Sequence, residues 1–96
     1  KGALVMMTRS LSQALIEHGI RVNGLAPGLI RTPLTSALGF GDKSLHYEKK
    51  ILLKRLGEPE DCAGTAVFLL SAASAYIVGQ VVVVDGGLTV SQIGRM

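Results

Sequence analysis

The chain has 96 residues, of which 48% are hydrophobic and 18% are charged, with a net charge of +3. This length suits one small domain, and the composition excludes a disordered tail. No apolar run is long enough to cross a bilayer, so we expect no membrane partner. The basic residues are scattered and lack interleaved aromatic residues, which argues against a nucleic-acid-binding protein.

The single cysteine, Cys62, excludes an internal disulfide and suits a reducing compartment, so we expect a cytoplasmic protein. His18, His46 and Cys62 lack the spacing of metal ligands, and we expect no metal site. The chain begins with Lys1 and enters a helix at once, so we expect it to be a piece of a longer protein.

Residues 2–18 are predicted to form a helix that ends at Gly19, a residue that tolerates the left-handed cap. The apolar residues of its main face recur at helical spacing: Leu4, Met7, Leu11 and Leu15. A weaker stripe runs beside that face: Val5, Ser12 and Ile16. Two such faces indicate two partners for the helix, a sheet and a helix of another subunit.

Residues 20–25 are short, branched and apolar, which predicts a buried strand that stops before the turn-forming pair Pro27-Gly28. Thr32 is expected to cap a helix that has Pro33 at its first position. In open α/β sheets, ligands bind where a strand ends in a turn that leads into a helix. Asn23 is interpreted as an amide that bonds nearby backbone groups, with a direct ligand contact as the alternative.

The helical periodicity weakens over residues 33–54, a stretch that is long for a connection inside a compact domain. Segments of this kind are commonly lids or binding loops. This one carries enough apolar surface to close over a ligand: Leu34, Leu38, Phe40, Leu45 and Tyr47. We therefore expect residues 33–54 to form a substrate-binding lid.

A further helix is predicted to begin around Pro59, because acidic residues surround that proline, and to run to about Leu70. Its buried residues are expected to be Ala63, Ala66, Val67 and Leu70, with Cys62 as a small core residue. Residues 81–84 are four valines, the continuous apolar pattern of a strand buried on both faces of a parallel sheet. The sequence Asp85-Gly86-Gly87 ends that strand in a turn.

The order helix, strand, lid, helix, strand indicates an α/β fold, the C-terminal portion of a doubly wound parallel sheet. Two parallel strands and their crossover do not make an independent sheet. We therefore expect residues 1–96 to be the C-terminal segment of a single domain whose other strands lie upstream of Lys1.

Several stretches, in this order and over essentially the whole chain, resemble the classical short-chain dehydrogenase/reductases. They are Lys1-Gly2-Ala3-Leu4, Arg21-Val22-Asn23, residues 27–32, residues 55–61, residues 76–80 and Asp85-Gly86-Gly87. The pattern is similar to that of 3-oxoacyl-carrier-protein reductases and of glucose, gluconate and polyol dehydrogenases. The resemblance implies a Rossmann-like oxidoreductase that uses NAD or NADP. It would transfer a hydride between nicotinamide and a carbonyl or alcohol carbon of a small substrate.

The resemblance also implies roles for particular residues. Lys1 would be the lysine of the family's Tyr-x-x-x-Lys pair, whose ammonium lowers the pKa of the tyrosine and donates to the ribose hydroxyls. Thr32 and the main chain of Ile30 would hold the nicotinamide carboxamide, and Pro27 and Gly28 would wall the ring. The plain alternatives are a surface lysine at the start of a helix and an ordinary helix cap at Thr32.

The family's glycine-rich dinucleotide loop, its NAD-or-NADP discriminating residue and its catalytic serine and tyrosine are not among these 96 residues. The 96 residues alone are therefore expected to be inactive. The resemblance implies that the full-length parent is a homo-oligomer, a tetramer, with contacts through helix 2–18 and the C-terminal strand. The alternative function is a truncated, non-catalytic module that serves only assembly. A tyrosine four positions before Lys1 in the parent sequence would favour the enzyme.

Overall fold

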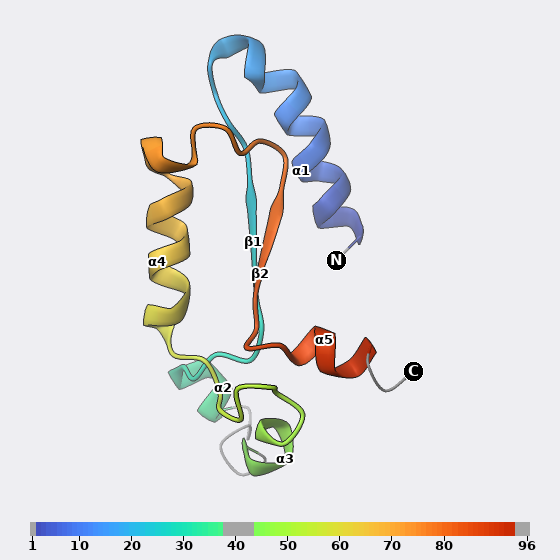
Figure 1. Ribbon diagram of the computed structural model, residues 1–96, viewed down its shortest axis with the longest axis vertical. Coiled ribbons are helices and arrows are strands. Elements are labelled where there is room, and N and C mark those ends of the chain that lie inside the picture. Colours follow the sequence, from blue (N-terminus) through green and yellow to red (C-terminus); the bar gives the residue numbers. More distant parts are fainter. Residues whose placement is uncertain (1, 38–43, 94–96) are drawn as a thin grey trace. The chain divides into compact units, whose positions relative to one another are not determined.

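The computed structural model describes residues 2–37 and 44–93 (Figure 1). Its elements are α1 (Gly2–Leu15), η1 (Ile16–His18), β1 (Gly24–Pro27), α2 (Pro33–Ala37), α3 (Ser44–Glu48), α4 (Pro59–Leu69), η3 (Ala72–Ser74), β2 (Val81–Val84) and α5 (Leu88–Ile93). These elements form two compact units. The first spans Lys1–Ala26 and Gly64–Val83, and the second spans Pro27–Ala63 and Val84–Met96. No helix in the described part of the chain is long and apolar enough to span a membrane.

β1 and β2 are paired in parallel. The N–H of Gly24 donates to the carbonyl of Gln80 (2.8 Å), and the N–H of Gly28 donates to that of Val84 (2.9 Å). The donors and the acceptors both advance by four residues, as a parallel ladder requires. Pro27 falls between two donors to β2, so its missing N–H interrupts no bond to that strand.

The predicted strand 20–25 is therefore wrong in its bounds, since β1 runs from Gly24 to Pro27. The residues before β1 make side-chain contacts instead. The guanidinium of Arg21 donates to carbonyls at the end of α4 and beyond it: Leu69, Ser71, Ser74 and Ile77. The Asn23 amide donates to the Ile77 carbonyl and accepts from the N–H of Gln80, each at 3.0 Å. These bonds confirm the interpretation of Asn23 as an amide that satisfies backbone groups.

In the first unit, the buried face of α1 is made of small hydroxyl residues. Thr8 and Ser12 are 4% and 5% exposed, and the Ser12 hydroxyl donates to the Val22 carbonyl at 2.8 Å. A Cβ added at Gly24 would lie 3.3 Å from the Thr8 hydroxyl oxygen, so the helix approaches the strand closely. Only short side chains fit at that separation, and their hydroxyls donate to the carbonyls of Leu4 in the helix and of Val22 just before the strand.

The predicted main face of α1 is accordingly wrong, because Leu4, Met7 and Leu11 are exposed. Of the weaker stripe, Ser12 is buried, whereas Ile16 is exposed. The predicted end of the helix is confirmed. Gly19 has a left-handed φ of +75°, and its N–H donates to the Ile16 carbonyl.

The predicted bounds of the second helix and the second strand are confirmed by α4 and β2, but the predicted burial of Val67 and Leu70 is wrong. Val67 and Leu70 are 67% and 86% exposed, and Val83 is 44% exposed. Cys62 is half-buried. Two strands and two long helices leave apolar faces without a covering layer, so strong hydrophobicity here does not produce burial within this chain.

In the second unit, the start of α2 matches the prediction. Pro33 is the first helical residue, and the Thr32 hydroxyl accepts from the N–H of Thr35 at 3.2 Å. The Thr35 hydroxyl in turn accepts from the N–H of Thr32 at 2.9 Å. This reciprocal pair is a capping box with threonine in the position that Glu or Gln commonly occupies.

The apolar core of the second unit contains Ile51 and Leu56, which are 2% and 7% exposed. The turn after β2 supports this core. The N–H of Leu53 donates to the carbonyl of Gly86 (3.1 Å), and a Cβ on Gly86 would lie 2.9 Å from Ile51. Part of the predicted lid 33–54 is thus packed on this turn, and residues 38–43 of it lie outside the described residues. Its function as a substrate lid remains a prediction.

α5 was not predicted from the sequence. The predicted turn Asp85-Gly86-Gly87 is present, and the Asp85 carboxylate accepts from the N–H groups of Gly87 (2.9 Å) and Thr89 (3.0 Å). An aspartate that bonds backbone N–H groups in this way starts a helix as well as ending a strand.

Candidate functional site

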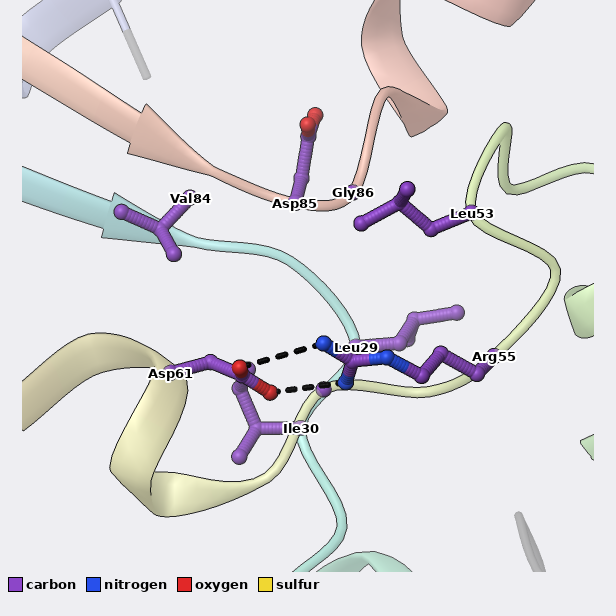
Figure 2. Close-up of a pocket in the computed structure, with 9 residues that line it drawn as sticks. Leu29, Ile30, Leu53, Arg55, Asp61, Val84, Asp85 and Gly86 are labelled. Carbon is purple, nitrogen blue, oxygen red and sulfur yellow. Dashed lines mark hydrogen bonds and ion pairs between the residues drawn. The ribbon is translucent and has the colours of Figure 1, made fainter.

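The candidate site lies in the second unit, where β1 and β2 both end. A cavity of about 140 Å³ opens there, beside the chain that leaves each strand (Figure 2). Its lining residues are Leu29, Ile30, Leu53, Arg55, Gly57, Asp61, Val84, Asp85 and Gly86. In open α/β sheets, the carboxyl ends of the strands are where ligands bind.

Gly28 is required by the close approach of the two strand ends. A Cβ on Gly28 would lie 2.6 Å from the Cβ of Asp85 and 2.8 Å from its Cα, distances that real Cβ atoms essentially never show. A side chain at this position would force the chain after β1 away from the chain after β2. Packing of the two strand ends therefore requires glycine at position 28, whether or not a ligand binds.

Ile30 is held in place by an isolated parallel bridge with Gly57. The N–H of Gly57 donates to the carbonyl of Leu29 (2.9 Å), and the N–H of Arg31 donates to the carbonyl of Gly57 (2.8 Å). A Cβ on Gly57 would lie only 2.6 Å from the Ile30 Cδ1. The bridge therefore fixes the main chain after β1 and also brings the Ile30 side chain against Gly57.

An ion pair borders the cavity next to this bridge. Arg55 Nη1 and Nη2 donate to the two carboxylate oxygens of Asp61 at 2.8 and 3.2 Å (Figure 2). The same carboxylate accepts from the N–H of Glu58 at 2.7 Å, at the start of α4. The hydrogen bond from Arg55, followed by that from the Glu58 N–H, lowers the pKa of Asp61 to about 2. The hydrogen bond to Asp61 correspondingly raises the pKa of Arg55.

This pair should make stability depend on pH in the acid range. The folded-state pKa of Asp61 is depressed from 3.8, so its contribution is present above pH 4 and is lost as the pH falls towards about 2. We expect the stability difference between the full-length protein and its Asp61→Asn variant to shrink over that interval. Urea unfolding at pH 7, 4 and 2 measures this difference. A constant difference would show that Asp61 titrates normally.

The structure brings four of the predicted site residues into the second unit. Pro27 is exposed at the end of β1, Gly28 and Ile30 follow it, and Thr32 caps α2. The fifth, Lys1, lies outside the described residues. Among the residues that the structure describes, no group of three or more acidic, histidine or cysteine side chains could hold a metal ion.

The Arg55–Asp61 pair was not predicted as part of the site. The sequence offered one signal for it, an arginine just ahead of a helix whose first turn is acidic. The pair flanks Gly57 in sequence, and Gly57 bridges to Ile30, which is far from it in sequence.

Comparison with known proteins identifies the family. The profile of a family described as enoyl-(acyl carrier protein) reductase matches residues 1–89. Dehydrogenase/reductase SDR family member 4 of Caenorhabditis elegans is 44% identical over 92 residues, covering 92% of this chain and 35% of that protein. The chain belongs to the short-chain dehydrogenase/reductase family. The resemblance seen in the sequence is thereby confirmed.

Other relatives agree. The 3-oxoacyl-acyl-carrier-protein reductase FabG of Chlamydia pneumoniae is 46% identical over 89 residues, covering 93% of this chain and 36% of that protein. A gluconate 5-dehydrogenase of Burkholderia cenocepacia, solved with NADP and tartrate, is 41% identical with a TM-score of 0.84, covering 94% of this chain and 36% of that one. The likeness confirms the fold class, part of a doubly wound Rossmann-like sheet. The chain spans about a third of the length of these relatives.

Proposed function

We propose that the full-length protein is an NAD(P)-dependent oxidoreductase. It transfers a hydride between the nicotinamide and a carbonyl or alcohol carbon of a small substrate. Membership of the family supports this proposal, as does the NADP bound to the gluconate 5-dehydrogenase relative. The structural observation that carries it is the edge of the second unit where both strands end, next to a cavity. The cofactor is proposed to be NAD or NADP.

At this edge, Thr32 and the main chain of Ile30 are proposed to hold the nicotinamide carboxamide. The Thr32 hydroxyl accepts the N–H of Thr35 and donates to the Thr35 hydroxyl oxygen at 3.3 Å, so a carboxamide partner would replace that long hydroxyl–hydroxyl bond. Pro27 is exposed at the end of β1 and, with Gly28, is proposed to form the wall beside the nicotinamide ring.

Lys1 is proposed as the catalytic lysine. An ammonium beside a tyrosine hydroxyl favours the phenolate and brings the pKa of the tyrosine towards neutral pH. The same group can donate to the ribose hydroxyls of the cofactor. The tyrosine of the pair, which would lie four positions before Lys1, would exchange a proton with the substrate oxygen while the hydride moves to or from the carbon that bears that oxygen.

The protein is also proposed to be a cytoplasmic homo-oligomer, a tetramer by resemblance, with contacts through α1 and β2. The exposed apolar side chains of α1, namely Leu4, Met7 and Leu11, support an interface on that helix. The same exposed face would also suit the alternative function, an assembly module without catalytic activity.

Cofactor titration of the purified full-length protein distinguishes these functions. We expect nicotinamide fluorescence to report binding of NADH or NADPH, and absorbance at the nicotinamide band to report turnover with at least one substrate class. Acyl thioesters, sugar acids and polyols form the test panel. An assembled protein that binds neither cofactor would refute the enzyme and favour the assembly module.

Thr32 gives a more local test of the same function. Thr32→Ala in the full-length protein should raise the KM for the nicotinamide cofactor, whereas the loss of a helix cap alone costs only about 1 kcal/mol. Thr35→Ala is the matched control, because it breaks the same capping box and keeps the Thr32 hydroxyl. Steady-state kinetics and thermal melts measure both effects. A lower melting temperature with an unchanged KM would reduce Thr32 to a cap.

A further inference from the structure

We propose that Arg55 and Asp61 are positioning residues that hold the main chain of Ile30 in place for the nicotinamide. This inference rests on the proposed function, which assigns that main chain to the carboxamide. Neither side chain is proposed to touch the cofactor. They act through Gly57, which lies between them in sequence and is bonded to both sides of Ile30.

The main chain around Ile30 depends on Gly57 for its support. It has left the β1–β2 ladder, and its pairing with Gly57 is a single isolated bridge. In a parallel bridge of this kind, Gly57 uses both its N–H and its carbonyl, and bonds the carbonyl of Leu29 and the N–H of Arg31. In such a bridge the N–H and carbonyl of Ile30 itself point to the side opposite Gly57.

The ion pair fixes the peptide groups on both sides of Gly57. On one side, Arg55 Nη1 donates to the carbonyl of Leu56 at 3.1 Å. On the other, the Asp61 carboxylate accepts the N–H of Glu58 at 2.7 Å. The bidentate contact between Arg55 and Asp61 closes the arrangement, so Gly57 is held between two restrained peptide groups.

The surroundings of the bridge explain why this restraint is needed. The Ile30 Cδ1 lies 2.6 Å from where a Cβ of Gly57 would be, so the space beside position 57 is taken and no side chain at that position can anchor it. The cavity of about 140 Å³ lies beside both residues and gives that side little packing. Figure 2 shows Arg55 reaching along this cavity towards Asp61, with Ile30 next to the pair.

A second ion pair on the same segment provides a matched control. Arg31 Nε donates to Glu58 at 3.0 Å, and the Arg31 and Arg55 side chains are both 51% exposed. The Arg31 side chain bonds no peptide group next to Gly57 among the residues described. Arg31→Ala therefore removes an equally exposed arginine and leaves the proposed restraint intact.

The test compares Arg55→Ala with Arg31→Ala in the full-length protein. The probes are the reduced cofactor that the protein prefers and the matching ADP-ribose, which lacks the nicotinamide. Arg55→Ala should weaken binding of the reduced cofactor by about tenfold and leave binding of ADP-ribose within about twofold. Arg31→Ala removes an ion pair with Glu58 but keeps the Arg55–Asp61 contacts, so it should weaken binding of the reduced cofactor less than Arg55→Ala does. Arg55→Lys keeps the charge without the bidentate geometry and should give an intermediate loss.

Amide hydrogen exchange tests the positioning without any cofactor. The amide of Gly57 makes one of the bridge bonds in both variants, and it should exchange faster in Arg55→Ala than in Arg31→Ala. Unchanged exchange would overturn the proposal, as would an equal loss of affinity for both probes. If the unmodified protein binds no reduced cofactor, the proposed function is refuted, and the exchange rates still decide whether the pair holds the bridge.

Discussion

Replacement of Lys1 by methionine in the full-length protein is expected to lower kcat by about two to four orders of magnitude, the usual contribution of general acid–base catalysis. Methionine has a similar length and no charge, so the variant removes the ammonium and keeps most of the bulk. Without that charge, the pKa of the partner tyrosine returns towards its ordinary value near 10, and the phenolate is scarce at neutral pH.

The pH dependence of the reaction separates this effect from a folding defect. For alcohol oxidation, which needs the phenolate, the ascending low-pH limb of the rate profile of Lys1→Met should move to higher pH, so the loss of turnover should be smaller at pH 9 than at pH 7. Lys1→Arg is the control that keeps a positive charge, and it should retain more activity than the methionine variant. Near-normal turnover of Lys1→Met at pH 7 would contradict the catalytic role and return Lys1 to an ordinary residue at the start of a helix.

The parts of the fold that local chemistry determines could be predicted from sequence. Thr32 and Pro33 start α2 as expected, because a hydroxyl cap and a fixed proline φ act within a few residues. Gly19 and the turn after β2 were predicted for the same reason. The four valines of β2 mark a strand whatever covers it.

The errors concern interactions between distant residues. The apolar pattern of α1 favoured Leu4, Met7 and Leu11 as the buried face, yet Thr8 and Ser12 occupy it because the helix approaches Gly24 too closely for large side chains. β1 starts later than its branched residues suggest, since the position of β2 decides where the ladder begins. Hydrophobic periodicity predicts neither how closely two elements approach each other nor the register of a partner strand.

The candidate site shows the same division. A strand that ends in a turn predicted where a ligand would bind, whereas the resemblance to the family implied the roles of Pro27, Gly28, Ile30 and Thr32, and the structure places these four in one unit. The restraint on Ile30 could not be predicted, because it needs Gly57 at the far end of a long connection and an ion pair around that glycine. Such a contact becomes visible only when the chain is folded.

The 96-residue polypeptide produced by itself is expected to self-associate and to bind no NAD(H) or NADP(H). Among the described residues, Ile51 and Leu56 are the buried hydrophobic ones, whereas many large apolar side chains are exposed. The most exposed of them are spread along the chain: Met6, Leu34, Leu53, Val67, Leu70, Tyr76 and Val90. A pair of parallel strands is marginally stable alone, and each strand here has one edge without a neighbour in the described part of the chain.

The exposed apolar side chains favour self-association, because contacts between copies remove apolar area from water. Each large side chain that passes from water into a contact stabilises the associated state by roughly 1.5–3 kcal/mol, so a few such contacts between copies outweigh the entropy lost on association. Sedimentation velocity across a range of concentrations should show species larger than a monomer, and a titration with NADH and NADPH should show no saturable change in fluorescence. A well-folded monomer with micromolar cofactor affinity would contradict this expectation, because it would show that these 96 residues bury enough surface and contain enough of the binding site on their own.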